Sequence, residues 1–250
     1  MPKLLLFDIE TMADKAYVWE HYEANVISYV KPWYIMSFAY KWSDGRIKAY
    51  SLPDFKGYKR DPTDDKELCR ELWKLFNEAD IIVAHNGNAF DIKKAQAKFV
   101  EHGFRPPRPF KSVDTKLVAK RYFKFNSNKL DDLGKFLHIG QKMHTGGWQL
   151  WLDCERGDKK AWQKMVKYNK RDVELLEKIY LKLRPWMKDH PNYNLISDTY
   201  FRCRVCGSKD LMKQGRRATH SGLSQQFSCN ECGNWSSAPI RDDILSGRVR

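Results

Sequence analysis

The sequence has no long apolar run and no basic amphipathic segment of the kind that anchors a chain to a membrane. A helix that crosses a bilayer needs about 20 consecutive apolar residues, so we expect no membrane association. The short apolar run in residues 3–10, KLLLFDIE, ends in acids and is typical of a buried strand, not of a signal peptide. Internal repeats and low-complexity segments are also missing, which argues against repeat architectures and disordered tracts.

Acidic residues are scarce compared with basic ones: 31 Asp and Glu stand against 45 Lys and Arg, and the formal net charge is +14. Such a balance does not dictate a fold, but it favours polyanionic partners through electrostatic steering and counterion release. Because the sequence offers no membrane anchor, nucleic acid is the expected partner. Cysteines are few as well, and four of the six have metal-ligand spacing, so we expect a reducing cytoplasm and no disulfides.

The hydrophobic pattern predicts a mixed sheet followed by helices, which is an α/β arrangement. Asp44-Gly45 marks a hairpin between two of the strands. The expected strands are residues 3–10, 33–42, 46–51 and 81–86, with a further short strand reached through the proline-rich residues 105–115. The expected helices are residues 61–80, 90–103 and 164–183, and helices dominate from residue 115 to residue 185. Turn formers without a clear period fill residues 185–200, which predicts one domain of residues 1–195 and a second of residues 200–250.

Two acids, Asp8 and Glu10, lie two residues apart on the first expected strand. Period-two geometry places both on one face of the sheet. Like charges on a buried strand repel each other and lose solvation, so at least one should be protonated or compensated. No structural need explains two acids on a central strand, and we therefore interpret the pair as functional.

Two further acids extend this set. Asp172 falls on the apolar stripe of the helix at 164–183, one turn after Tyr168, and Asp91 opens another helix. Asp91 alone could be an ordinary acid at a helix N-terminus, and Asp172 alone could be an ion-pair partner. If the fold brings the acids together, Mg²⁺ or Mn²⁺ is the natural compensation. Two such ions about 3.5–4 Å apart can activate water and stabilise a leaving oxygen in phosphoryl transfer.

Three segments, FDIET, HNGNAFD and YNKRD, resemble the three motifs of the DEDD 3′–5′ exonucleases, in the branch with a tyrosine in motif three. That family includes the proofreading exonucleases of DNA polymerases. The motifs occur in the expected order over residues 3–185, with Asp8 and Glu10 in the first, Asn86, Phe90 and Asp91 in the second, and Tyr168 and Asp172 in the third. The chain is most similar to small stand-alone members, often phage-borne, that are related to family B polymerase exonuclease domains. The resemblance implies a ribonuclease H-like mixed sheet flanked by helices, without a polymerase domain, and the cytoplasm of a bacterium or phage-infected host.

The resemblance also implies roles. Asp8, Glu10 and Asp172 would hold one Mg²⁺ or Mn²⁺, and Asp8 and Asp91 would hold a second. Tyr168 would orient the attacking water. The expected reaction is 3′–5′ hydrolysis of nucleic acid, most simply DNA with a free 3′ end. A structure-specific or RNA-directed nuclease on the same site is one alternative, and a nucleic-acid-binding module with an inactive exonuclease fold is another.

Substrate contacts follow less directly. By resemblance, Thr11 would meet the 3′ end through its backbone, and Met12 would stack on the terminal base or serve only in packing. Phe90 is expected as a core anchor for its loop, with a nucleic-acid contact as the alternative, and Asn86 as a substrate contact or a turn former. Separately, Lys142 lies in a glycine-containing segment before the last helix, which indicates either a phosphate-contacting loop or a plain turn.

The cysteines near the C-terminal end form two Cys-x-x-Cys pairs, each followed by glycine: Cys203, Cys206, Cys229 and Cys232. Thiolates at these spacings close a tetrahedral Zn²⁺ site, and four protein ligands make it structural. The stretch resembles the zinc ribbons of transposases and transcription factors. Basic residues including Arg204, Arg216 and Arg217 make nucleic acid the expected ligand, and docking of a replication or recombination protein is the alternative.

Overall fold

The computed structural model describes residues 2–20, 22, 25–196, 202–220 and 222–240. The chain divides into two compact units: Lys3–Tyr180, here the large unit, and Leu181–Arg250 with Met1–Pro2, here the small unit. Part of the expected linker, residues 197–201, lies outside the described residues, and the domain boundary near it stays a prediction. In the described part of the chain, no helix is both long and apolar enough to cross a membrane.

A five-stranded mixed sheet forms the centre of the large unit, in the order β5-β4-β1-β6-β7. The strand β1 is antiparallel to β4 on one side and parallel to β6 on the other, while β5 is antiparallel to β4 and β7 is parallel to β6. The strands are β1 (Leu4–Thr11), β4 (Ile35–Trp42), β5 (Lys48–Ser51), β6 (Ile81–Ala84) and β7 (Lys111–Asp114). The predicted strands and the hairpin at Asp44-Gly45 are confirmed, with ends that differ by a few residues.

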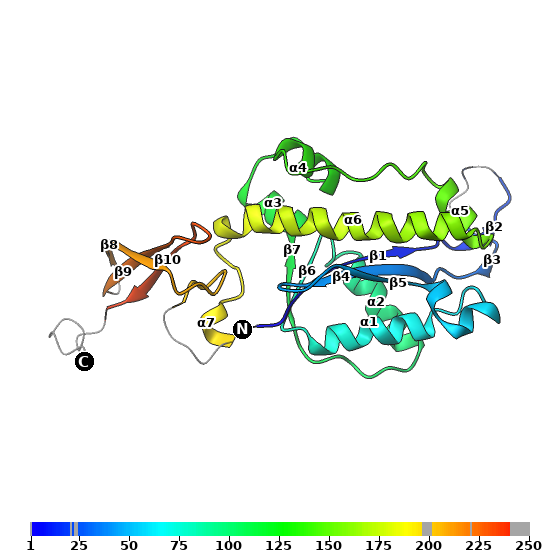
Figure 1. Cartoon of the computed structure of the whole chain (residues 1–250), viewed down its shortest axis with the longest axis horizontal. Coiled ribbons are helices and arrows are strands. Elements are labelled where there is room, and N and C mark those ends of the chain that lie inside the picture. Colours follow the sequence, from blue (N-terminus) through cyan, green and yellow to red (C-terminus); the bar gives the residue numbers. More distant parts are fainter. Residues whose placement is uncertain (1, 21, 23–24, 197–201, 221, 241–250) are drawn as a thin grey trace. The chain divides into compact units, whose positions relative to one another are not determined.

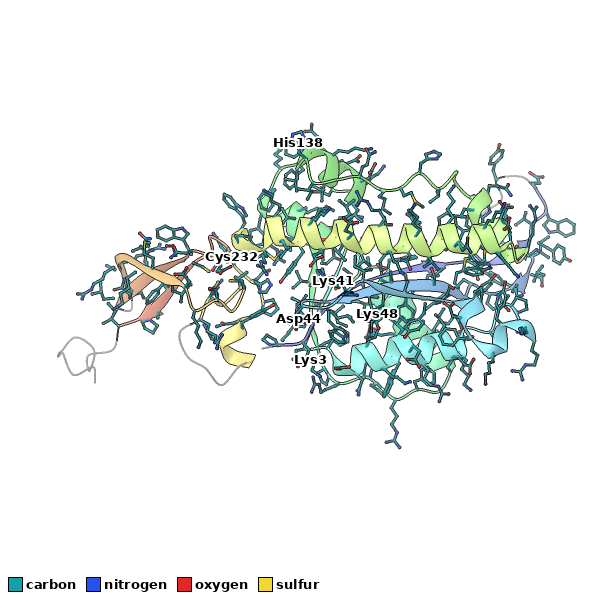
Figure 2. All side chains as sticks on the ribbon, viewed as in Figure 1. Lys3, Lys41, Asp44, Lys48, His138 and Cys232 are labelled. Carbon is teal, nitrogen blue, oxygen red and sulfur yellow. The ribbon has the colours of Figure 1, made fainter. Side chains whose placement is uncertain are left out.

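Helices cover both faces of this sheet: Figure 1 shows α6 along one face, and α1 and α2 along the other. The helices of the unit are α1 (Lys66–Glu78), α2 (Asp91–Glu101), α3 (Thr115–Tyr122), α4 (Leu130–Phe136), α5 (Gln149–Glu155) and most of α6 (Lys159–Leu183). Two short 3₁₀ turns, η1 (Leu52–Asp54) and η2 (Lys56–Lys59), follow β5. Lys41 of β4, labelled in Figure 2, forms an ion pair with Glu177 of α6 and so ties the sheet to that helix.

Helix α1 begins later than the sequence predicts. The sequence predicts a helix over residues 61–80, but the helix starts at Lys66. The side chain of Asp61 accepts hydrogen bonds from the backbone N–H and the hydroxyl of Thr63, at 2.9 and 2.8 Å. This local turn competes with the helix for the backbone, which explains the delayed start.

A two-stranded sheet that the sequence analysis missed follows β1. It consists of β2 (Lys15–Tyr17) and β3 (Ser28–Lys31), paired antiparallel. Both strands are largely exposed, so this hairpin has no buried face that would give its sequence a regular alternation of polar and apolar residues.

The small unit contains a three-stranded antiparallel sheet in the order β10-β9-β8. Its strands are β8 (Leu211–Thr219), β9 (Gly222–Cys229) and β10 (Trp235–Pro239), and two short helical segments precede them, η3 (Arg184–Trp186) and α7 (Tyr193–Ile196). A small buried cluster of this unit consists of Cys203 and Val205, which precede the sheet, and Cys229 at the end of β9. So few apolar side chains make a small core, as expected for a module held by a metal.

Candidate active site

Strand β1 presents two acids on one face of the central sheet. Asp8 lies opposite Ala39 and Glu10 opposite Ser37 of β4. Phe7 points to the other face, where its ring meets that of Phe76 in α1 with centroids 5.0 Å apart. The strand alternation therefore directs apolar residues toward α1 and the acids toward α6. The pairing with β4 is irregular directly after Glu10, as at a β-bulge.

Helix α6 adds a third acid, Asp172, which is fully buried. Carboxylate oxygens of Asp8, Glu10 and Asp172 all lie within 4.8 Å of one another; these three residues are called the carboxylate cluster below. The predicted inward stripe of the helix is confirmed, because its other members are buried as well: Met165, Tyr168, Leu175, Leu176, Ile179 and Leu183. The structure thus brings the first and third sequence motifs together.

Asp91 lies at the border of the carboxylate cluster and outside its closest group. It is the first residue of α2, it is 4% exposed, and its Oδ1 accepts a hydrogen bond from the backbone N–H of Ile9 at 3.2 Å. This bond fixes the start of α2 against β1, between Asp8 and Glu10. All four predicted acids therefore lie in one region of the large unit.

Burial raises the pKa of every one of these carboxyl groups. The pKa of Asp8 is well above its ordinary value because of burial, followed by the charges of Asp91, Glu10 and Asp172. Burial and then the charge of Asp172 raise the pKa of Glu10 to about 8, and burial raises that of Asp91 to about 7. The pKa of Asp172 is also raised by burial, against the opposing effect of Lys142. A bound cation would relieve this arrangement by compensating the negative charge.

Lys142 reaches the carboxylate cluster from the segment between α4 and α5. Its Nζ lies 2.6 Å from Oδ2 of Asp172 and donates a hydrogen bond to the hydroxyl oxygen of Tyr168 at 2.8 Å. Its backbone N–H is fixed by Oδ1 of Asp131 at 2.7 Å. Burial by itself lowers the pKa of Lys142, but Asp172 and Tyr168 raise it overall, so the ammonium group is charged. The side chain of Lys142 therefore pairs with the site itself, and its predicted phosphate contact stays a prediction.

Asn169 is a site residue that the sequence analysis missed. Its side chain is fully buried, and its Nδ2 donates to Oδ2 of Asp8 at 2.6 Å and to the backbone oxygen of Asp8 at 3.2 Å. The hydroxyl of Ser37 donates in turn to Oδ1 of Asn169 at 3.2 Å. Asn169 therefore orients Asp8 from α6. The signal was present within YNKRD, as a polar residue next to Tyr168 on the inner side of the helix.

Asp114 is a second missed residue, and it holds the loop that precedes Asp91. It caps α3, and its carboxylate also accepts hydrogen bonds from the backbone N–H groups of Asn86 and Asn88, at 2.9 and 3.1 Å. A Cβ atom on Gly87 would lie 2.4 Å from the Cβ of Ala84, so only glycine fits there. An acid directly before a helix is a cap signal that could have been read from the sequence.

The residues expected to contact the substrate differ in their exposure to solvent: Met12 is buried, Phe90 is exposed, and Thr11 and Asn86 are half-buried. Met12 is 5% exposed and packs in the core, in agreement with the packing alternative, and its stacking on a terminal base stays a prediction. Phe90, expected as a core anchor, is instead 38% exposed, because it precedes α2 at the surface of the loop. Asn86 adopts a left-handed turn conformation with φ of 65° and accepts from Lys116. Thr11 ends β1 and is half-buried.

The carboxylate cluster fits a divalent cation. Oxygens within 4.8 Å of one another can share an ion whose ligand distances are about 2.0–2.1 Å, and carboxylates are the donors that Mg²⁺ and Mn²⁺ prefer. Oδ1 of Asp172 is buried and has no hydrogen-bond partner among the described residues. A buried anionic oxygen without a donor is costly, and a cation would remove that cost.

The four cysteines of the small unit also come together, in the turn after α7 and in the turn between β9 and β10; Cys232 is labelled in Figure 2. Their Sγ atoms lie within 4.8 Å of one another, and two Sγ–Sγ distances are 3.6 Å. A tetrahedral Zn²⁺ with Zn–S distances of about 2.3 Å needs sulfur atoms roughly 3.8 Å apart. The cluster therefore fits a zinc ribbon. Arg216 and Arg217 are exposed on β8, and Arg204 donates to the backbone oxygen of Lys188.

The fold defines a ribonuclease H-like α/β protein, and its carboxylate cluster is compatible with a divalent cation. Residues 34–184, more than half of the chain, match the RNase_H superfamily, and the chain belongs to this superfamily.

Among solved structures, the family B DNA polymerase from the hyperthermophilic archaeon Pyrobaculum calidifontis has a similar fold, with a TM-score of 0.52 and 19% sequence identity. The match covers 74% of this chain but only 25% of the polymerase, so the chain spans about a quarter of that protein.

Proposed function

We propose that this chain is a metal-dependent 3′–5′ exonuclease that hydrolyses phosphodiester bonds, with DNA as its substrate. The observation that carries the proposal is the meeting of Asp8, Glu10 and Asp172 within 4.8 Å, with Tyr168 one helical turn before Asp172. These residues come from the first and third motifs that resemble the DEDD exonucleases. Membership of the RNase_H superfamily and the fold shared with part of a family B DNA polymerase support the proposal.

The chemistry assigns each acid a role. Two Mg²⁺ or Mn²⁺ ions would activate the attacking water and stabilise the leaving oxygen. Asp8, Glu10 and Asp172 would hold the first ion. Asp91, which faces β1 at Ile9, would join Asp8 at the second. Asn169 keeps Asp8 in place from α6, so that its carboxylate is already oriented when a cation arrives.

Tyr168 would position the water. Burial, with the charges of Glu10 and Asp172, raises the pKa of Tyr168, so that its hydroxyl keeps its proton. Because Lys142 donates to the hydroxyl oxygen, the tyrosine O–H needs a different oxygen as its acceptor, and Asp172 is one such neighbour. A hydroxyl fixed in this way can hold a water molecule in one orientation without removing its proton.

The small unit would bind nucleic acid around a structural Zn²⁺. In residues 202–240, six Lys and Arg stand against two Asp and Glu. A closed Cys₄ site leaves no position for a reacting ligand, so this unit would contribute affinity and no chemistry.

The experiment is the digestion of 5′-labelled single-stranded DNA, duplex DNA and RNA in Mn²⁺. A ladder that shortens from the 3′ end of DNA is expected. Cleavage at internal positions would indicate a structure-specific nuclease, and cleavage of RNA alone an RNA-directed enzyme. Binding without any cleavage would contradict the proposal and indicate a binding module with an inactive fold.

A further inference from the structure

The β2–β3 hairpin gathers most of the apolar surface of the large unit. Of the seventeen large apolar side chains that are exposed in the described part of the chain, eight lie in residues 17–30. Trp19 is 82% and Tyr29 is 63% exposed. The described members of this surface, called the hairpin surface below, are Tyr17, Val18, Trp19, Tyr22, Val26, Ile27, Tyr29 and Val30. An apolar group of this size on a protein surface indicates an interaction site.

The composition of the hairpin surface favours flat ring systems as its partners. Half of its described members are aromatic, and β2 and β3 pair only with each other. Lys15 and Lys31 lie opposite each other at the base of the hairpin, and Glu20 is the one acid among the described residues of 15–31. Exposed aromatic rings with ammonium groups beside them suit the bases and phosphates of an unpaired strand.

A path of rings and ammonium groups connects the hairpin with the carboxylate cluster. Phe90 directly precedes Asp91, and Nζ of Lys94 lies 5.8 Å from the Phe90 ring centroid and 3.6 Å from that of Trp33. Trp33 follows β3 by two residues, and its backbone N–H donates to Asp14, the residue before β2. The path therefore runs without interruption from the acid at the start of α2 to the base of the hairpin.

The backbone provides a second connection between the carboxylate cluster and the hairpin surface. Strand β1 carries Asp8 and Glu10 and ends at Thr11, and β2 begins at Lys15. A substrate strand held at the carboxylate cluster by its 3′ end must leave along one side of the large unit. The hairpin is the part of that surface where exposed rings are concentrated and where both connections end.

We propose that the hairpin surface is a stacking platform for the unpaired bases of a nucleic-acid strand whose 3′ end lies at the carboxylate cluster. This inference rests on the proposed nuclease function and adds a binding site to it. The bases stack on Trp19 and its neighbouring tyrosines, and Lys94 and Lys31 lie near the phosphates that lead to Asp91. Because every base has a π-face, the platform accepts any sequence.

The test compares strands that are long enough to reach the hairpin with strands that are too short. The probes are a single strand of about 12 nucleotides, within the range one such surface holds, and a trinucleotide, both carrying 2-aminopurine, whose fluorescence falls on stacking. Binding to the full-length protein is measured in Ca²⁺ in place of Mg²⁺. Carboxylates bind Ca²⁺ with looser geometry, so the strand should be bound without being cleaved. The variants are Trp19→Phe, Trp19→Leu and, as an exposed apolar control in α2, Val100→Ser.

Trp19→Leu should weaken binding of the long strand roughly 5- to 100-fold, the range for removal of one base–aromatic stack, and should remove the fluorescence loss. Trp19→Phe should retain most of both, while Val100→Ser and trinucleotide binding should not change. Unchanged binding of the long strand by Trp19→Leu would overturn the proposal. So would concentration-dependent dimers that Trp19→Leu abolishes without affecting strand binding, because the hairpin would then dock a second copy. Failure of the nuclease proposal is seen separately, as absent cleavage in Mn²⁺ by protein that still binds the strand.

Discussion

At the scale of single residues, the placement of Asp8 depends on an amide from a distant part of the chain. Asn169 lies 161 positions away, yet its Nδ2 is 2.6 Å from the Asp8 carboxylate. The acids were predictable because their motifs have fixed spacings and a fixed order. Asn169 and Asp114 each had a local signal, but their tertiary partners, like the pairing of Lys142 with Asp172, are encoded by no local pattern.

Replacing Asn169 by alanine should reduce the rate of hydrolysis and raise the Mn²⁺ concentration needed for half-maximal rate, each by roughly 10- to 100-fold. Asp8 would lose the donor that orients it, while the carboxylate itself would remain. Initial rates over a Mn²⁺ series measure both quantities. Lys170→Ala, a change at the exposed next residue of the same helix, is the control and should match the wild type. Equal Mn²⁺ dependence of the two variants would show that Asn169 has only a packing role.

Replacing Tyr168 by phenylalanine should lower the catalytic rate by roughly 10²- to 10⁴-fold, the range for a group that handles or positions a proton. The ring remains packed against Trp151, with centroids 6.2 Å apart, so the thermal midpoint should barely change. Single-turnover rates test the effect. Tyr180→Phe, which removes a buried hydroxyl from the same helix, should leave the rate unchanged. A wild-type rate for Tyr168→Phe would mean that the tyrosine is a core aromatic residue only.

At the scale of elements, the long elements that bury one face were predicted from the sequence, and the exposed β2–β3 hairpin was missed. The continuous apolar run of β1 and the stripe of α6 are both consequences of burial, and both were predicted. The β2–β3 hairpin is exposed on both strands, so neither period two nor a buried run marks it. Helix α1 starts late because Asp61 stabilises a turn, a competition between local hydrogen bonds that hydrophobic periodicity does not report.

The approach of α6 to β1 has a consequence for stability. The pKa of Glu10 is raised to about 8 and that of Asp91 to about 7, so the folded chain binds these protons more tightly than the unfolded chain. Their favourable contribution is complete below the unfolded pKa near 4 and is lost as the pH rises through the folded pKa. Without added divalent ions, the free energy of unfolding should therefore be lower at pH 8 than at pH 6.

Added Mn²⁺ should restore more stability at pH 8 than at pH 6, because it competes with fewer protons for the carboxylates. Urea denaturation at both pH values, with and without Mn²⁺, measures this difference. Glu10→Gln removes one titrating group and should flatten part of the pH dependence, while other groups in the chain titrate as before. A Mn²⁺ effect that is the same at both pH values, or absent, would contradict a cation site formed by these acids.

At the scale of the whole molecule, the proposed function assigns the chemistry to the large unit and part of the affinity for nucleic acid to the small one. The acids lie in the large unit and the Cys₄ cluster in the small one. The presence of both modules was predictable from motif spacing, because each site requires a fixed set of ligands. The described units divide at Leu181, within the helix α6, which a search for turn formers could not have identified.

Loss of the zinc site should weaken binding without abolishing cleavage. Cys229→Ser removes one of four ligands, and a unit with so small a core should unfold without its metal. The salt dependence of single-strand binding should become shallower, by about 0.7 in slope for each phosphate that the small unit no longer neutralises. A chain that ends at residue 195 keeps all of α6 and should behave in the same way. Affinities and slopes equal to those of the wild type would favour protein docking as the role of the small unit.

The most direct test of the central claim, that Asp8, Glu10 and Asp172 form the hydrolytic centre, is the digestion of a 5′-labelled DNA strand in Mn²⁺ by Asp8→Ala protein. No ladder is expected from this variant, although it should bind the strand nearly as well as the wild type. Asp44→Ala, a change of an exposed acid in the β4–β5 turn (Figure 2), should give the wild-type ladder. A full ladder from Asp8→Ala would contradict the account.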